Sequence, residues 1–282
     1  MPGVPPQRFV FLGPEGTFAE QALLTIPAAE RGTRIPARSV PEALDAVRDG
    51  DADAALEVLR AAPEGVVWLE QDAGSEEGLE LVRRRAVDAG RAIFHAAREG
   101  DAESALGALG AFRLLCAHRR GPYGVAAWGP QVEGWLAADV AGFSADERWY
   151  PGRPLMVTEN DYALRLYNGD TGVIVAHEGR VSAAFERRGE VMHVAPSRLE
   201  AVETVHAMTI HKAQGSQFGT AAVLLPDRAS RLLTRELLYT AITRAREELI
   251  LAGTEDAVRA AVERPVARAS GLRELLWGGL GR

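Results

Sequence analysis

The stretch Met208-Thr-Ile-His-Lys-Ala-Gln-Gly-Ser-Gln-Phe218 joins an apolar run to a dense group of polar residues and a glycine. The residues that lead into this stretch, Thr204–Thr209, have the composition of a buried strand. A second apolar run, Thr220–Leu225, follows just after it. Open α/β sheets bind their ligands at strand ends, where small polar residues and glycines gather. This stretch therefore predicts an α/β fold with a binding site inside it.

Strand and helix patterns continue to alternate after this stretch. Helices are expected from Ile210, over Thr234–Ala245 and from Thr254, and strands over Thr220–Leu225 and Glu248–Ala252. Such alternation predicts a parallel sheet covered by helices.

Upstream, Val66–Leu69 and Phe112–Ala117 are further strand candidates, separated by stretches rich in Ala, Leu, Glu and Arg that favour helix. From Gly152 to about Val194 the pattern changes to four short apolar runs separated by Asn-Gly-Asp, Glu-Gly and Arg-Gly turns. Turn residues at this regular spacing predict a small antiparallel meander or barrel, inserted between two pieces of one α/β domain.

The composition indicates a globular chain. At 282 residues it is long enough for two domains, and 47% hydrophobic with 25% charged residues excludes a disordered protein. No apolar run approaches the roughly 20 residues of a membrane-spanning helix. The single cysteine, Cys116, excludes an internal disulfide. We expect a cytoplasmic protein without a membrane partner.

The net charge of −7 is unevenly distributed. Residues 1–110 have a net charge of −8, whereas residues 111–282 have a net charge of +1. Any anion-binding surface is therefore expected in the second part, as a local patch. Lys212 is the only lysine of the chain.

Five residues of the opening stretch are candidates for contact with a phosphorylated ligand. Thr209 and His211 can donate hydrogen bonds to phosphate oxygens, and Lys212 adds a positive charge. Gly215 lets the backbone approach a ligand, and Gln217 offers an amide. The alternative is an ordinary polar loop with a solvated lysine, but seven polar or glycine positions within ten residues count against it.

A second segment, Leu237-Leu-Tyr-Thr-Ala-Ile-Thr-Arg-Ala-Arg-Glu-Glu-Leu-Ile-Leu-Ala-Gly253, predicts a helix that leads into a strand. Arg244 and Arg246 fall at the expected C-terminal end of that helix. They either complement the helix dipole, or Arg244 steadies charge on a transferring phosphoryl group as an arginine finger. Composition alone favours the dipole role.

These two segments resemble motifs V and VI of superfamily 1 helicases, and specifically of the RecD branch (exodeoxyribonuclease V alpha subunit). Leu115-Cys-Ala-His-Arg-Arg-Gly-Pro-Tyr-Gly-Val125 resembles the RecD strand and loop that open the second RecA-like domain. Thr158-Glu-Asn-Asp-Tyr-Ala-Leu-Arg-Leu-Tyr-Asn-Gly-Asp-Thr-Gly172 resembles the start of the small SH3-like barrel inserted in that domain. The resemblance extends from about residue 64 to Leu276.

The resemblance implies roles for named residues. Gly215 and Gln217 would face a nucleotide, with Arg244 as the catalytic arginine finger. Thr209, His211 and Lys212 would contact single-stranded DNA. ATP and Mg²⁺ would be cofactors, and RecB- and RecC-like subunits would be partners. Ala213 departs from the family pattern, which usually has Ser there, so one hydroxyl contact is lost.

The ATP-binding motifs of the family are missing from this sequence. A P-loop requires Gly-Lys-Ser/Thr after a strand, and Lys212 lies in motif V instead. Asp146-Glu147 follows Gly-Phe-Ser-Ala, a loop composition, and does not form a Walker B strand end. We expect no metal site and no ATP hydrolysis by this chain alone.

The first 56 residues resemble the N-terminus of prephenate dehydratase. Phe11-Leu-Gly-Pro-Glu-Gly-Thr-Phe18 and Ser39-Val-Pro-Glu-Ala-Leu-Asp-Ala-Val-Arg-Asp-Gly-Asp-Ala-Asp-Ala54 carry this resemblance. It implies the turn that lines the substrate cleft of a periplasmic-binding-like fold. After Ala55 the match stops, and the Thr-Arg-Phe motif with the catalytic threonine does not follow.

The sequence thus predicts a chimeric α/β chain. Residues 1–56 would be the prephenate-dehydratase-like fragment, 57–110 a mostly helical connecting region, 111–150 and 201–282 a RecA-like domain, and 151–200 the inserted SH3-like β module. A gene rearrangement, a misassembled gene model and a deliberate fusion all fit this pattern.

Three functions are compatible with this organisation. The first is a RecD-type helicase part that binds nucleotide or single-stranded DNA and needs a P-loop domain for turnover. The second is a dehydratase-type lyase, disfavoured by the missing threonine motif. The third is a non-catalytic DNA-binding or partner-docking module built on the β insert.

Overall fold

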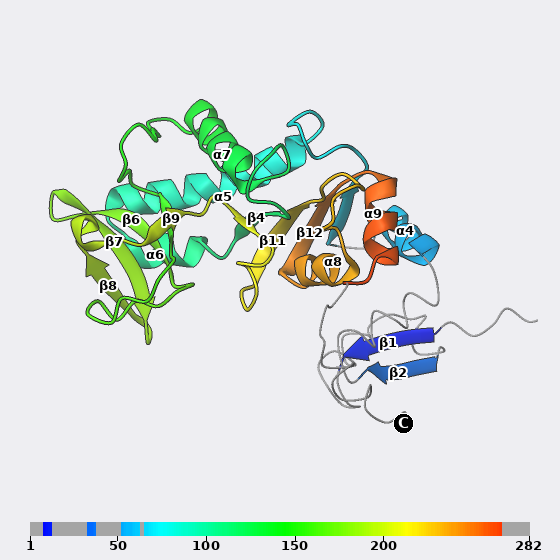
Figure 1. Cartoon of the computed structure of the whole chain (residues 1–282). Helices are drawn as coiled ribbons and strands as arrows, with labels where there is room; N and C mark the ends of the chain where they lie inside the picture. Colours follow the sequence, from blue (N-terminus) through cyan, green and yellow to red (C-terminus); the bar gives the residue numbers. More distant parts are fainter. Residues whose placement is uncertain (1–7, 13–32, 38–51, 63–64, 267–282) are drawn as a thin grey trace, which may run out of the picture.

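The computed structural model describes residues 8–12, 33–37, 52–62 and 65–266 (Figure 1). Two five-stranded sheets, one parallel and one antiparallel, form the main body of the described chain. Strands β1 (Arg8–Leu12) and β2 (Thr33–Ala37) pair with each other in parallel. The predicted α/β class with a parallel sheet is confirmed.

The parallel sheet is made of strands that are far apart in the sequence. In spatial order they are β10 (Ala207–Thr209), β4 (Phe112–Cys116), β11 (Phe218–Leu224), β12 (Ala245–Ala252) and β3 (Val66–Leu69). The side chains of the three strands β10, β4 and β11 are buried in near-continuous runs, as parallel strands covered on both faces require.

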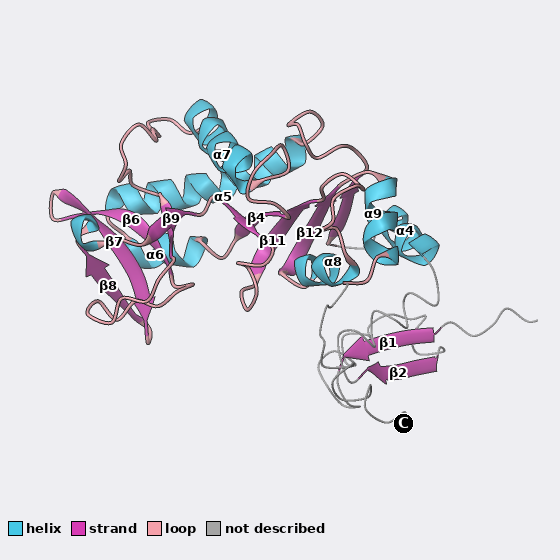
Figure 2. Ribbon diagram, in the orientation of Figure 1, coloured by secondary structure: helices cyan, strands magenta, loops and turns pink. Residues whose placement is uncertain are grey.

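Helices cover both faces of this sheet (Figure 2). One face carries α4 (Ala52–Ala61), α8 (Arg235–Ile242) and α9 (Glu255–Glu263), which share one buried cluster. The other face carries α5 (Glu80–Glu99) and α7 (Val125–Asp139), which share a second cluster.

Helix α4 runs across the predicted boundary between residues 56 and 57. Its Leu56 is fully buried in the same cluster as Leu238 of α8 and Val258 of α9. The strand β3 that follows is the edge strand of the parallel sheet. Residues on both sides of the predicted boundary therefore pack into one α/β unit.

The antiparallel sheet is formed by the residues between α7 and β10, and we refer to it as the β module (residues 154–204). In spatial order its strands are β8 (Glu190–Val194), β7 (Arg180–Arg187), β6 (Thr171–His177), β5 (Pro154–Val157) and β9 (Val202–Thr204). A single 3-10 turn, Pro196–Arg198, precedes β9. The described ladder runs from β8 to β9, and an SH3-like closure of it stays a prediction.

Both faces of the β module are packed. One face lies on α5 and α6 (Ala102–Ala108), where Ile93 and Ala105 contact the cluster of Val175. The other face has its own core around Ile174 and Phe185. This two-sided burial fixes the β module against the helical layer of the parallel sheet.

The single strand expected over Thr204–Thr209 is in fact the end of one strand and the whole of another, because the chain changes sheets within it. Residues up to Thr204 belong to β9, which pairs antiparallel with β5, whereas β10 starts at Ala207 and pairs in parallel with β4. Val205 and His206 form the connection between the two sheets. An apolar run does not indicate that the pairing strand changes from β5 to β4, so the sequence pattern predicted one strand instead of two.

The helix expected from Ile210 is also wrong. Residues 210–215 form successive turns, and Gly215 has a φ of +87°, outside the helical region. The segment must pass β4 and bring the chain from the end of β10 to the start of β11 in only eight residues. A regular helix has no room for that crossing.

Arg113 of β4 contacts the connection between the two sheets and stabilises it. Its side chain is 4% exposed and donates hydrogen bonds to the carbonyl oxygens of Val205 and Leu109, the latter at 3.0 Å. Its guanidinium carbon lies 5.1 Å from the centre of the Phe218 ring. Burial lowers the pKa of Arg113 to about 10, so the side chain stays charged at neutral pH.

His206 belongs to a buried hydrogen-bonded chain with Tyr150 and Glu133. The Tyr150 hydroxyl donates to Glu133 Oε1 at 2.7 Å and lies 2.7 Å from His206 Nε2. Because the one hydroxyl proton of Tyr150 is used on Glu133, His206 must donate from Nε2. Burial lowers the pKa of His206 to about 3, with further lowering by the charges of Arg113 and Arg153.

We therefore expect the stability of the chain to fall in mild acid because of His206. In the unfolded chain this histidine takes up a proton below about pH 6.5, whereas the folded chain resists protonation down to about pH 3. Its contribution is thus complete above pH 6.5 and declines by up to about 1.4 kcal/mol per pH unit as the pH falls. Urea unfolding at a series of pH values should show a shallower pH dependence for His206→Gln than for the natural sequence, and equal slopes would contradict the assignment.

Candidate functional site

The six predicted site residues form two groups at opposite ends of the parallel sheet. Thr209 is the last residue of β10 and is paired in register with Cys116, at the carboxyl end of the strands. Phe218 begins β11 opposite Ala245, the first residue of β12. Gly215, Gln217 and Arg244 come shortly before these two residues and therefore lie at the amino end of the strands.

The first group consists of Thr209, His211 and Lys212. Thr209 is buried, and its hydroxyl accepts a hydrogen bond from the Lys212 backbone N–H at 3.3 Å. His211 is exposed, and Lys212 is half-buried. The threonine therefore shapes the turn that presents the two basic side chains.

A groove of about 980 Å³ runs along this first group. The parallel-sheet domain supplies one wall, with residues that follow β4 and β10, and the β module supplies the other. Its polar lining residues are Arg119, Thr158, Asn168, Glu203, Thr209, His211, Lys212 and Gln214. Arg119, Asn168 and Glu203 were missed by sequence reasoning, because only the packing of the β module brings them beside the turn.

Lys212 is not free in this groove. Its ammonium forms a salt bridge with the carboxylate of Glu203, which β9 presents from the opposite wall. The two side chains are 27% and 38% exposed, so both reach the solvent-filled groove. The alternative of a merely solvated lysine is therefore wrong.

The second group consists of Gly215, Gln217 and Arg244. The Nη1 of Arg244 donates to the Ser216 carbonyl at 2.8 Å, which joins the end of α8 to the turn. Gln217 Nε2 lies 3.5 Å from the Thr243 carbonyl. The space where Gly215 would carry a Cβ is empty for 4 Å, so a ligand can approach its backbone.

Arg244 also caps α8. Its Nε donates to the Thr240 carbonyl at 2.9 Å, one of the last carbonyls of that helix, and its Nη2 donates to the Thr243 hydroxyl at 2.9 Å. This geometry supports the helix-end interpretation, while the finger role stays a prediction. Arg246 lies in β12 and is exposed, so its expected position at the helix end is wrong. Ile242, the last residue of α8, is 38% exposed.

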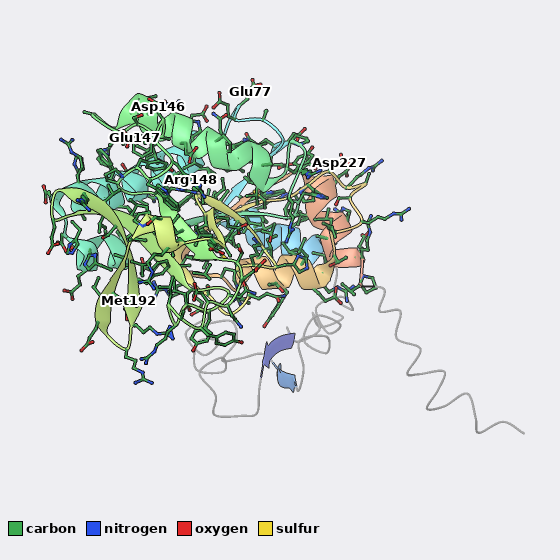
Figure 3. The ribbon with its side chains drawn as sticks, turned by 60° about the vertical axis from the view of Figure 1, so that its left-hand side comes forward. Glu77, Asp146, Glu147, Arg148, Met192 and Asp227 are labelled. Carbon is green, nitrogen blue, oxygen red and sulfur yellow. The ribbon has the colours of Figure 1, made fainter. Side chains whose placement is uncertain are left out.

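Asp146 and Glu147, which lack the sequence context of a Walker B pair, do not follow a strand. Asp146 and Glu147 lie on the loop after α7 (Figure 3), where Asp146 accepts a hydrogen bond from Ser144 at 2.7 Å. Among the described residues, no cluster of three or more His, Cys, Asp or Glu side chains could hold a metal ion. Gly215 leaves an open approach to its backbone and Arg244 carries a guanidinium, which are groups of the kind that bind phosphate oxygens. None of the described helices has the length and apolar character to cross a membrane.

Comparison with known proteins covers most of the chain. Residues 204–252 match the model of the UvrD-like helicase C-terminal domain, a segment that contains all six predicted site residues. The chain is 49% identical to the RecBCD enzyme subunit RecD of Mycolicibacterium smegmatis, over 84% of this chain and 41% of that protein. It is 47% identical to the RecD subunit of Mycobacterium tuberculosis, over 81% of this chain and 39% of that protein. The ATP-dependent RecD2 DNA helicase of Deinococcus radiodurans is 30% identical over 75% of this chain and 29% of its own length.

These matches confirm the resemblance to the C-terminal region of RecD-type helicases. The chain spans about two fifths of the length of the curated RecD subunits it matches. A match over 84% of 282 residues has to begin before Ala52, so it includes α4 and the end of the second prephenate-dehydratase-like stretch. The prephenate dehydratase resemblance stays a prediction, since Gly13–Phe18 and Ser39–Asp51, which carry most of it, lie outside the described residues.

The position of Arg244 gives a stability test. Arg244→Ala should lower the free energy of unfolding by about 1–2 kcal/mol, because charged hydrogen bonds to several carbonyls are lost together. Amide exchange should quicken around Ser216, whose carbonyl loses its partner. The matched control Arg246→Ala removes an exposed arginine of β12 and should stay within about 0.5 kcal/mol of the natural chain. Equal stability of the two variants would show that Arg244 does not hold the turn.

Proposed function

We propose that this chain is the C-terminal motor part of an ATP-dependent DNA helicase of the RecD type, which acts in DNA recombination and repair. The observation that carries the proposal is the division of the motif V and VI residues between a groove at the carboxyl end of the parallel sheet and an open turn at its amino end. The similarity of more than four fifths of the chain to RecD subunits supports the same assignment.

The groove between the β module and the parallel-sheet domain is the proposed path of single-stranded DNA. Arg119, His211 and Lys212 provide positive or donor groups on one wall. Asn168 and Thr158 add neutral polar groups on the other. Such a lining suits a phosphate backbone and reads little base sequence, as a translocating strand requires.

Gly215, Gln217 and Arg244 are the proposed contribution to nucleotide binding. Bound ATP and Mg²⁺ would supply the phosphoryl transfer that drives movement. This chain would offer an approachable backbone at Gly215 and the cationic guanidinium of Arg244. In the ground state that guanidinium is held by turn carbonyls, so its finger role requires an exchange of partners. The P-loop lysine has to come from another polypeptide segment, because Lys212 is the only lysine of this chain.

The parallel-sheet unit of this proposal includes α4 and β3. It therefore starts at or before Ala52, because Leu56 is part of its core. An SH3-like fold for the β module, RecB- and RecC-like partner subunits and a cytoplasmic location belong to the same proposal. No observation on the described residues favours a lyase.

The proposal predicts DNA binding without ATP turnover. The chain should bind oligodeoxythymidine weakly, and its affinity should fall with salt at a logarithmic slope of about −0.7 to −1.4, because the groove lining carries two cations, Arg119 and Lys212, and Lys212 is paired with Glu203 in the natural chain. Phosphate release from ATP should stay at the background rate with and without DNA. Arg244→Ala, at the other end of the sheet, should bind the oligonucleotide as the natural chain does. ATP turnover by the purified chain, or a complete lack of DNA binding, would contradict the proposal.

A further inference from the structure

The salt bridge between Lys212 and Glu203 spans the proposed DNA groove. Both residues line it, and each comes from a different wall. Of the charged residues on this lining, two are basic, Arg119 and Lys212, and one is acidic, Glu203. Glu203 therefore neutralises one of the two cations that a phosphate would meet.

The backbone that carries Glu203 is held in place by the fold. Glu203 pairs with Met156 in the ladder between β9 and β5. Two residues later, the Val205 carbonyl accepts a hydrogen bond from the buried Arg113. The β9 backbone is thus fixed on both sides, and the acid can leave Lys212 only by side-chain rotation.

We propose that Glu203 is a built-in competitor for the DNA backbone, so that Lys212 holds a phosphate only by exchanging it for the Glu203 carboxylate. This inference rests on the proposed function, because it concerns the same groove. A phosphate that enters replaces one anionic partner with another. The net gain in binding free energy is smaller than it would be for a lysine without an acidic partner. The contact between the phosphate and Lys212 is therefore easier to break.

As a consequence, the groove binds single-stranded DNA only weakly at Lys212. When a phosphate leaves Lys212, the carboxylate returns to the ammonium, and no unpaired charge remains in the half-buried groove. Glu203 thereby lowers the cost of releasing each phosphate as a strand moves past. A neutral residue in its place would convert a transient contact into a persistent one.

The experiment is a double-mutant cycle on the full chain. The natural sequence, Glu203→Gln, Lys212→Ala and the double variant are titrated with a fluorescently labelled oligodeoxythymidine at several salt concentrations, and anisotropy is recorded. Glu203→Gln should tighten binding about two- to fivefold. Its salt slope should steepen by about 0.7, because a freed Lys212 releases one more counterion on binding single-stranded DNA.

The double variant separates competition from general charge repulsion. If Glu203 acts through Lys212, the gain from Glu203→Gln disappears in the Lys212→Ala background. An equal gain in both backgrounds would overturn the inference and indicate simple repulsion of DNA by the acid. The matched control is Glu200→Gln, which removes one exposed carboxylate three residues earlier and should change the affinity less than Glu203→Gln.

The failures of the two proposals are distinguishable. If the natural chain binds DNA but Glu203→Gln leaves the affinity unchanged, only the competitor role is lost. If neither protein binds DNA, the groove assignment itself is wrong and both fall. Thermal unfolding of each variant confirms that the changes in binding occur in a folded chain.

Discussion

The buried guanidinium of Arg113 is the interaction on which the arrangement of the two sheets depends. It lies where α6 ends, where β9 passes into β10 and where β11 begins, and it contacts all three through Leu109, Val205 and Phe218. A charge this deep is tolerated because carbonyl oxygens and an aromatic face surround it. Its Nε has no hydrogen-bond acceptor among the described residues, so the remaining contacts have to be well formed.

The position of the β module follows from that junction. With Val205 and His206 fixed, β9 has no freedom to swing away from β10, and Glu203 faces the turn that carries Lys212. The chain of His206, Tyr150 and Glu133 adds a second link from the junction to α7. The groove is therefore a product of the junction, since neither sheet alone has both of its walls.

The short crossing from β10 to β11 explains the division of the site. Eight residues connect opposite ends of the parallel sheet, so one turn presents Lys212 at the carboxyl end and Gln217 at the amino end. Arg244 binds the second half of the turn through Ser216. The two groups of candidate residues are therefore close in the sequence but lie at opposite ends of the sheet.

The sequence by itself determined the α/β class, the antiparallel β module and the segments that carry the site. Those features are local: apolar runs, turn residues at regular spacing and a cluster of polar residues after a buried strand are visible within ten or twenty positions. It also grouped Thr209, His211 and Lys212 separately from Gly215, Gln217 and Arg244, through the family resemblance.

Only the tertiary structure decided which sheet each strand joined and which side chains face one another. Thr204–Thr209 reads as one strand, because it contains no Gly, Pro, Asn or Asp at the point where the chain changes sheets. Glu203 carries no local sign of its position, since its partner Lys212 is brought to it by a junction built around Arg113, ninety residues upstream. Pairings of this kind depend on long-range packing, which periodicity along the chain does not encode.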